Sequence, residues 1–86
     1  MVYHVEFGRS AAKQFTKLPR QDQIRLKSRL DALSRNPRPR GAIKLKGEEE
    51  ALFRLRAGDY RILYQVKDCI LLVLVLKVAH RKEVYR

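Results

Sequence analysis

The sequence predicts an α+β fold of two layers, in which an antiparallel sheet carries two N-terminal helices on one face. Three observations lead to this class: leucines recur at helical spacing within residues 20–35, apolar and polar residues alternate on either side of residues 57–59, and an unbroken apolar run fills residues 69–76. The expected order is strand, helix, helix and three further strands. A chain of 86 residues allows one hydrophobic core, so we expect a single domain over residues 1–86.

The N-terminal segment predicts a short strand followed by a short helix. Residues 2–7 alternate, and one face of the strand would carry Tyr3, Val5 and Phe7. Ser10 is the expected N-cap of the helix, because its hydroxyl can accept a hydrogen bond from a backbone N–H. Apolar residues then recur at helical spacing until Pro19 stops the pattern; they are Ala11, Phe15 and Leu18.

A second helix is predicted after Pro19, a residue that suits the opening turn of a helix. Its apolar stripe consists of Leu26, Leu30 and Leu33, and the pattern ends at Asn36 and Pro37. Ile24 lies off this stripe. It is either a lone exposed apolar residue or part of a surface for a partner.

The remaining sequence predicts a loop and three strands. Residues 37–47 read as a basic loop, because two prolines and two glycines interrupt any regular period. Residues 52–56 and 60–66 alternate on either side of a tight turn, the pattern of a hairpin. The apolar run over residues 69–78 indicates a central strand covered on both faces, and residues 80–86 form a polar tail.

Alternation in the hairpin separates a core face from a face rich in arginine. The core side would carry Phe53, Leu55, Tyr60, Ile62, Tyr64 and Val66. The other side would carry Arg54, Arg56, Arg61 and Gln65. A four-residue turn over residues 56–59 would place Arg54 directly opposite Arg61. Like charges in that position destabilise a sheet by up to about 1 kcal/mol, and an anion held between them would reverse the sign of that effect.

The tail is expected to bring further polar groups to the arginines. The last strand returns antiparallel, so His80 and Arg81 would approach this face, with Tyr85 close behind. Charged side chains on an edge strand also protect sheets from aggregation. That alternative suits the arginines of residues 52–56 better than Arg61, which is expected on an interior strand.

The net charge of +11, from 20 Lys and Arg against 9 Asp and Glu, predicts an anionic partner. Nucleic acid is the leading candidate, ahead of an acidic protein or an anionic membrane. Cys69 is the one cysteine and no Cys/His cluster has zinc spacing, so we expect a reducing compartment and no metal. Residues 1–7 lack the pattern of a signal peptide, and no apolar run approaches the ~20 residues of a membrane span, which favours a cytoplasmic location.

The C-terminal half resembles a known family. The segment LFRLRAGDYRILYQV, the apolar strand after it and the tail HRKEVY resemble the RelE/ParE toxin superfamily, closest to its RelE branch, and KLKG resembles the linker of that family. These motifs fall within residues 44–86, whereas the first 43 residues agree in pattern only. The resemblance implies a ribosome-dependent endoribonuclease that cleaves mRNA in the decoding site, without a metal or cofactor. In such enzymes a 2′-hydroxyl attacks the adjacent phosphate.

The resemblance also implies roles for individual residues. Arg61 matches the strand arginine that binds phosphate, and its permanent charge suits a dianionic transition state. Arg81 matches the arginine assigned to charge stabilisation and to assistance of the leaving group. Tyr85 matches the aromatic residue that stacks on or orients the RNA. Arg54 and Arg56 match basic strand positions more loosely.

One departure from the family concerns the general base. The best-known RelE sequences carry a lysine two residues before the position of Arg54, where this chain has Leu52. An arginine is a poor proton acceptor and cannot readily replace that lysine. We therefore consider His80 as acid or base, because histidine commonly fills these roles at neutral pH, with Lys44 or Lys46 as alternatives reaching in from the loop.

The partners implied by the family are a ribosome with its mRNA and a small, acidic antitoxin of the RelB kind. The toxin–antitoxin complex would be a hetero-oligomer able to bind operator DNA, and no membrane partner is expected. Two other functions stay open. A ParE-like toxin would inhibit DNA gyrase, although Arg81 and Tyr85 argue against it, and a basic RNA-binding module would use the same arginines only to position phosphates.

Overall fold

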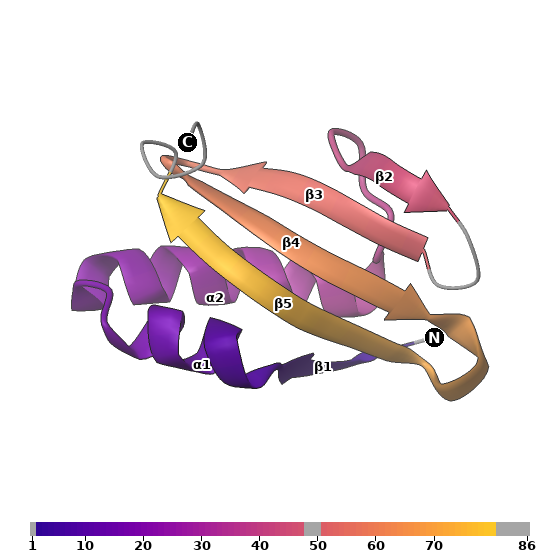
Figure 1. Cartoon of the computed structure of the whole chain (residues 1–86), viewed down its shortest axis with the longest axis horizontal. Coiled ribbons are helices and arrows are strands. Elements are labelled where there is room, and N and C mark those ends of the chain that lie inside the picture. The colour runs from indigo at the N-terminus through magenta and orange to yellow at the C-terminus, as the bar shows by residue number, and fades with distance from the viewer. Residues whose placement is uncertain (1, 48–50, 81–86) are drawn as a thin grey trace.

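The computed structural model describes residues 2–47 and 51–80, which form two α-helices, one 3₁₀ helix and a five-stranded sheet (Figure 1). The elements follow in the order β1 (His4–Phe7), α1 (Arg9–Thr16), α2 (Arg20–Arg35), β2 (Ile43–Gly47), β3 (Ala51–Ala57), β4 (Tyr60–Lys67), η1 (Asp68–Ile70) and β5 (Leu72–His80). The strands lie side by side in the order β1-β5-β4-β3-β2, which puts β4 at the centre.

The predicted α+β class and the two helices are confirmed, but the sheet differs from the prediction in two respects. It is mixed, because β1 pairs with β5 in parallel. It also has one more strand, because residues 43–47, predicted as part of a loop, form β2 at the edge. The turn that precedes β2 uses Gly41, whose φ of +98° favours glycine, so the glycine marks the start of a strand and not the middle of a loop.

The first helix begins earlier than predicted. Its N-cap is Gly8 and not Ser10, and the carbonyl oxygen of Gly8 accepts a hydrogen bond from the Ala12 N–H at 2.9 Å. Space explains the choice at this position. A Cβ at residue 8 would lie 3.3 Å from the carbonyl oxygen of Val75, so Gly8 allows the start of α1 to approach β5 closely.

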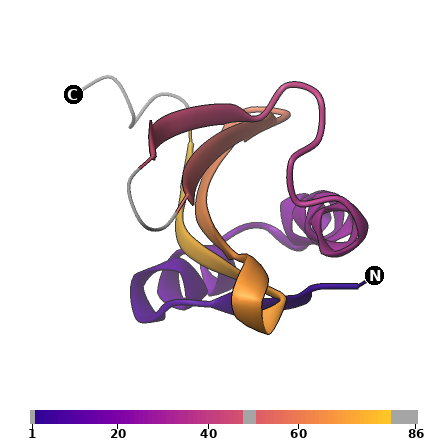
Figure 2. The ribbon, with the colours of Figure 1, turned by 90° about the vertical axis from the view of Figure 1, so that its right-hand side faces the viewer.

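The core lies between α2 and one face of the sheet, as Figure 2 shows from the side. The leucine stripe of α2 is buried as predicted, with Leu26, Leu30 and Leu33 each less than 5% exposed. Five of the six predicted core residues of the hairpin are also buried, and the sixth, Tyr60, is half-buried against them; the five are Phe53, Leu55, Ile62, Tyr64 and Val66. The hydroxyl of Tyr64 donates to the carbonyl oxygen of Pro37 at 2.8 Å, and burial raises the pKa of Tyr64 to about 12.

An ion pair joins the loop between α2 and β2 to the start of η1, which directly follows β4. Two guanidinium nitrogens of Arg38 lie 2.7 and 3.3 Å from the two carboxylate oxygens of Asp68, and the Tyr3 hydroxyl donates to the same carboxylate. The hydrogen bonds from Arg38 and then from Tyr3 lower the pKa of Asp68. This contact joins the segment before β1, the loop before β2 and the β4–β5 connection.

No helix within residues 2–47 and 51–80 is long and apolar enough to cross a membrane.

Candidate functional site

Three arginines share the face of the sheet that α2 leaves uncovered. In β3, Phe53, Leu55 and Ala57 are buried on the helix side, so Arg54 and Arg56 lie on the other side. In β4, Ile62 and Tyr64 are buried on the helix side, which places Arg61 with the other two arginines. We call Arg54, Arg56 and Arg61 the arginine face. The predicted separation of core side chains and arginines is confirmed.

The register of the hairpin differs from the prediction by one pair. Arg56 is directly opposite Arg61, whereas Arg54 is opposite Leu63. The cause is the turn, which has two central residues and not four. Gly58 takes the first central position with a φ of +63°, a conformation that glycine adopts without strain.

The corrected register still brings the three arginines together. Side chains directly opposite each other on antiparallel strands have Cβ atoms about 4.5–5.5 Å apart, and diagonal neighbours lie about 7–8 Å apart. Arg56 is the direct neighbour of Arg61, and Arg54 is its diagonal neighbour. Permanent positive charges at these separations repel one another. Such a cluster of permanent positive charge suits an anion lying across β3 and β4.

Protection of a sheet edge does not explain these arginines. Arg61 is half-buried on the central strand, with β3 on one side and β5 on the other, as the sequence predicted. Arg54 also lies inside the sheet, because β2 occupies the edge and Ile43 pairs with Arg54. These charges therefore repel one another inside the sheet, where there is no exposed strand edge for them to protect from aggregation.

A bulge in β5 determines which side chains reach the arginine face. Tyr64 pairs with Val75 and Leu63 pairs with Lys77, so Leu76 is an extra residue in β5. Lys77 is exposed and shares the face of Leu63, beside the arginines. Sequence reasoning missed Lys77, because the apolar run around it shows no alternation from which its direction could be read.

The same bulge moves His80 to the opposite face, so its predicted approach to the arginines is wrong. If all residues of β5 paired in sequence without a bulge, His80 would pair with Asp59 and share the face of Arg61. With it, His80 pairs with Tyr60, and the two rings meet edge to face with centroids 5.3 Å apart. Tyr60 alternates with Arg61 along β4, so Arg61 and His80 lie on opposite faces of the sheet.

The other predicted residues fall in three places. Lys44 pairs with Phe53 and therefore lies on the helix side, while Ile43 takes the place beside Arg54, so the expected approach of Lys44 to the arginines is wrong. The backbone of Lys46 pairs with that of Leu52, and its side chain is outside the described part of the structure. Arg81 and Tyr85 also lie outside the described residues.

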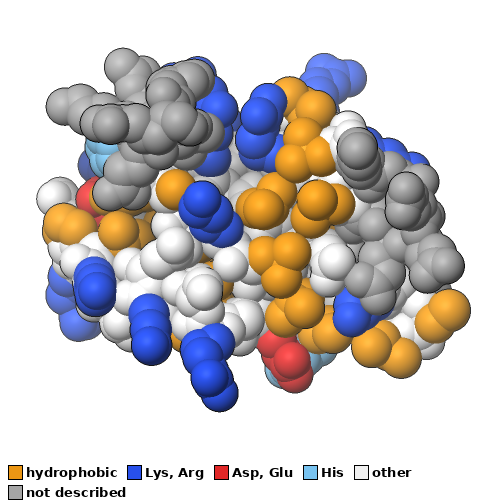
Figure 3. All heavy atoms as spheres, viewed as in Figure 1, with side chains coloured by type: hydrophobic (Ala, Val, Ile, Leu, Met, Phe, Trp, Pro, Cys, Tyr) orange, Lys and Arg blue, Asp and Glu red, His pale blue; other side chains and the backbone are white. Residues whose placement is uncertain are grey.

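Apolar side chains adjoin the arginines on this face. Leu52 and Leu74 flank Gln65 on neighbouring strands, and Leu63 separates Arg54 from Lys77. Figure 3 shows the hydrophobic side chains as a column with Lys and Arg beside it. The face can therefore contact a ligand that presents both negative charge and apolar or aromatic surface. Among residues 2–47 and 51–80, no group of three or more His, Cys, Asp or Glu residues is placed to hold a metal ion.

Known proteins resemble this chain in both sequence and fold. Residues 5–85 match the family described as the ParE toxin of the type II toxin–antitoxin system parDE. Toxin RelG of Mycobacterium tuberculosis is 36% identical to this chain, and the alignment covers 100% of this chain and 99% of that protein. The mRNA interferase toxin RelE of Escherichia coli is 35% identical, with 99% of this chain and 92% of that protein covered. The crystal structure of the archaeal RelE–RelB complex from Pyrococcus horikoshii superposes with a TM-score of 0.85 at 33% identity, covering 94% of this chain and 97% of that one.

Proposed function

The chain belongs to the ParE toxin family of type II toxin–antitoxin systems and is a toxin of the RelE type, and from this premise we propose that it is an endoribonuclease that cleaves mRNA in the decoding site of the ribosome. The observation that carries the proposal is the position of Arg61, half-buried at the centre of the sheet with Arg56 opposite and Arg54 diagonal to it. Such a cluster suits the phosphate of an RNA backbone. The relative from E. coli is named an mRNA interferase.

The proposed reaction is attack of a 2′-hydroxyl on the adjacent phosphate. The O2′–P bond forms, the P–O5′ bond breaks, and the products are a 2′,3′-cyclic phosphate and a free 5′-hydroxyl. The 2′-hydroxyl loses a proton, the 5′ oxygen gains one, and the phosphate carries additional negative charge in the transition state. Permanently charged guanidinium groups can stabilise that charge without a metal ion, which is why we propose a metal-independent reaction.

Each residue of the proposed site has a distinct role. Arg61 stabilises the added charge on the phosphate, and Arg54 and Arg56 hold the phosphates of the RNA in register. On the resemblance to the family, Arg81 contributes charge stabilisation and assists the leaving 5′ oxygen, and Tyr85 stacks on a base or orients it. Arginines bind and stabilise but do not accept a proton.

The position of His80 argues against a role for its imidazole in proton transfer at Arg61. A general base must come within hydrogen-bonding distance of the proton that it removes, and the sheet separates His80 from the arginine face. Of the lysines suggested by the sequence, Lys44 lies on the helix side as well. We therefore propose Lys46 as the proton acceptor to test first, because its backbone pairs with Leu52, the position that departs from the family.

The partner that neutralises the toxin is proposed to be a small acidic antitoxin of the RelB kind. Relatives of this chain have been crystallised as RelE–RelB complexes. A net charge of +11 favours an acidic partner, and the face that combines arginines with leucines offers it both charge and apolar contact. We propose that the two chains form a hetero-oligomer that binds operator DNA, and that the toxin acts in the cytoplasm, where ribosomes translate mRNA.

The principal rival is inhibition of DNA gyrase, because the matching family is described by its ParE toxin. One experiment separates the alternatives. Purified toxin is incubated with ribosomes programmed with a defined mRNA, the 5′ ends are mapped, and gyrase supercoiling is assayed in parallel. Cuts within the codon in the decoding site support the proposal. Intact mRNA with gyrase inhibition would establish the rival, and ribosome binding without cleavage would reduce the protein to an RNA-binding module.

A further inference from the structure

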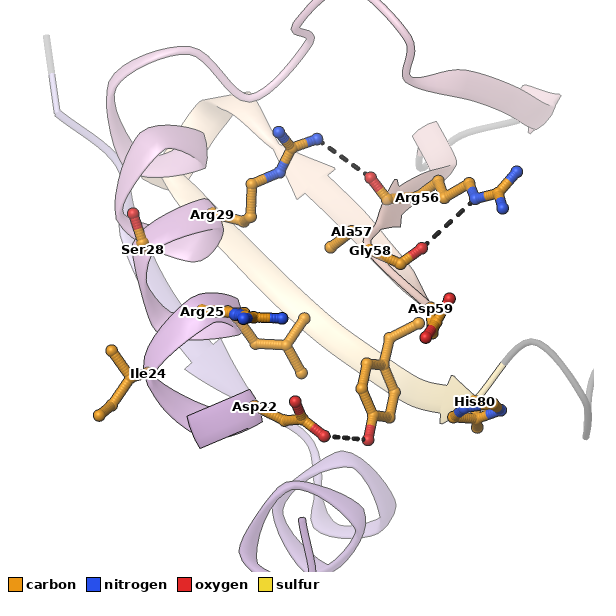
Figure 4. A pocket seen from close by; sticks show the side chains of 12 residues that line it. Asp22, Ile24, Arg25, Ser28, Arg29, Arg56, Ala57, Gly58, Asp59 and His80 are labelled. Carbon is orange, nitrogen blue, oxygen red and sulfur yellow. Dashed lines mark hydrogen bonds between the residues drawn. The ribbon is translucent and has the colours of Figure 1, made fainter. Parts of the chain in front are cut away.

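A pocket opens on the helix side of the sheet, away from the arginine face (Figure 4). It has a volume of about 480 Å³ and lies between the first half of α2 and the β3–β4 turn. That volume falls within the usual range of small-molecule sites. None of the chemistry proposed for Arg61 uses it.

One side of the pocket is cationic. Arg25 extends from α2 into the pocket, and within the described part of the chain its guanidinium makes no hydrogen bond or ion pair (Figure 4). Arg29, one turn further along α2, donates a hydrogen bond to the backbone carbonyl of Arg56 at 3.0 Å. That bond fixes the orientation of the Arg29 guanidinium and uses one of its five N–H donors, so the others remain for an anion.

The opposite side of the pocket is aromatic and rigid. The Tyr60 ring meets the His80 ring at an interplanar angle of 84°, and the Tyr60 hydroxyl donates to a carboxylate oxygen of Asp22 at 2.7 Å. Both contacts hold the Tyr60 ring in one orientation. A fixed aromatic ring beside guanidinium groups that still have N–H donors to offer is the combination that binds a base and its phosphate.

We propose that this pocket binds one nucleotide of the RNA that lies outside the cleaved bond, an inference that rests on the proposed action on RNA. The phosphate of this nucleotide would lie at Arg25 and Arg29, and its base would lie against Tyr60. Arg56 connects the two sites. Its carbonyl belongs to the pocket and its side chain to the arginine face, so an RNA strand can pass from one to the other around the β3–β4 turn.

The carboxylates in the pocket favour a nucleotide over an acidic peptide as the ligand. Asp22 and Asp59 line the pocket together with the arginines. They would repel the side chains of an acidic protein, but a carboxylate accepts hydrogen bonds from the amino groups of nucleobases. Arginines for the phosphate and carboxylates for the base match the two ends of a nucleotide.

The test is an NMR titration of the full chain with adenosine 5′-monophosphate (AMP), with adenosine and inorganic phosphate as separate probes. We expect AMP to shift resonances of Arg25, Ser28 and Tyr60 and to bind more tightly than either probe. Arg25→Gln should weaken this binding about tenfold, the effect of losing a charge-assisted hydrogen bond. Lys27→Gln is the matched control, since it removes the same charge from an exposed position of α2 outside the pocket, and it should change the affinity less than twofold.

Four outcomes would overturn the nucleotide pocket. Inorganic phosphate binding as tightly as AMP would leave the base without a role, and equal losses in the two variants would reduce the effect to net charge. Shifts caused by a glutamate-rich peptide and not by AMP would assign the pocket to a protein partner. AMP shifts confined to residues around Arg61 would contradict the nucleotide pocket while supporting the proposed cleavage site. Binding of AMP in the pocket without any cleavage of mRNA would support the pocket and contradict the proposed cleavage.

Discussion

Arg56 and Arg61 stand directly opposite each other on adjacent strands of the sheet. Like charges in this arrangement lower the stability of a sheet, so folding alone does not select the pair. The pair becomes favourable when a phosphate lies between the two guanidinium groups. Stability and function are therefore expected to change in opposite directions when one charge is removed.

The variant Arg56→Gln tests this opposition. Because it removes one of two repelling charges, we expect the free energy of unfolding to rise by a few tenths of a kcal/mol and by at most about 1 kcal/mol. Affinity for RNA should fall in the same protein. Urea denaturation and RNA titration measure the two effects. An unchanged affinity for RNA would contradict the role of the pair as an anion site, and a loss of stability would contradict net repulsion between the two arginines.

Arg61→Ala and Arg81→Ala should each slow single-turnover cleavage of mRNA on the ribosome by about 10²-fold or more, the scale of losing one group that stabilises transition-state charge. Circular dichroism should show that both variants remain folded. Lys27→Ala, which removes a charge from α2 on the other side of the sheet, serves as the control and should cleave at the wild-type rate. Wild-type rates in folded Arg61→Ala would rule out the proposed site.

His80→Gln should change the single-turnover cleavage rate by less than about threefold, because the ring of His80 faces away from the arginines. Loss of a general acid or base would instead cost 10²–10⁴-fold. The measurement is made on programmed ribosomes across a range of pH values. A large loss of rate would show that the imidazole reaches the RNA despite its position in β5.

Binding to the ribosome should weaken steeply as salt is added. Each phosphate of a single strand that the protein neutralises contributes about −0.7 to the slope of log K against log salt concentration. Arg61→Gln should make the slope less steep by about that amount, and Lys27→Gln should leave it unchanged. An identical slope in the wild type and in Arg61→Gln would contradict direct contact between Arg61 and phosphate.

The ion pair between Arg38 and Asp68 should make stability depend on pH. Its hydrogen bonds lower the pKa of Asp68 in the folded state, so its contribution is fully present above the pKa of the unfolded chain, about 3.9, and is lost as pH falls below that value. Asp68→Asn should therefore lower the melting temperature at pH 7. The difference from the wild type should shrink towards pH 3, and a constant difference would show that the carboxylate charge is not the cause.

Strict alternation and helical spacing made much of this fold predictable. The leucines of α2 and the two faces of the hairpin follow directly from the period of apolar residues, because burial on one side of an element leaves a clear pattern. Tertiary contacts fixed what the pattern left open. Gly8 starts α1 at a place where a Cβ would crowd the carbonyl oxygen of Val75, and β1 runs parallel to β5, a direction that no local pattern encodes.

The candidate site was predictable where the strands alternate and unpredictable where they do not. Arg54, Arg56 and Arg61 were assigned to one face, but the length of the turn decided which of them face each other. In β5 the apolar residues continue on both sides of Leu76, so the sequence contains no sign of the bulge that places Lys77 and His80. Arg25 and Arg29 form part of a pocket only because α2 packs beside the β3–β4 turn.

The bulge at Leu76 determines which face of the sheet each later residue of β5 occupies. If the same residues paired with β4 without the bulge, every side chain from Lys77 to His80 would exchange faces, turning the imidazole towards the arginines and Lys77 towards α2. Deleting Leu76 itself would leave Lys77 opposite Leu63 and His80 opposite Tyr60. A relative whose final strand lacks this insertion must accordingly be aligned with a one-residue offset beyond it, or residues with different surroundings will be compared as equivalents. A codon lost between Lys77 and His80, with the bulge kept, would instead pair His80 with Arg61 and bring the imidazole to the arginine face without altering any other side chain.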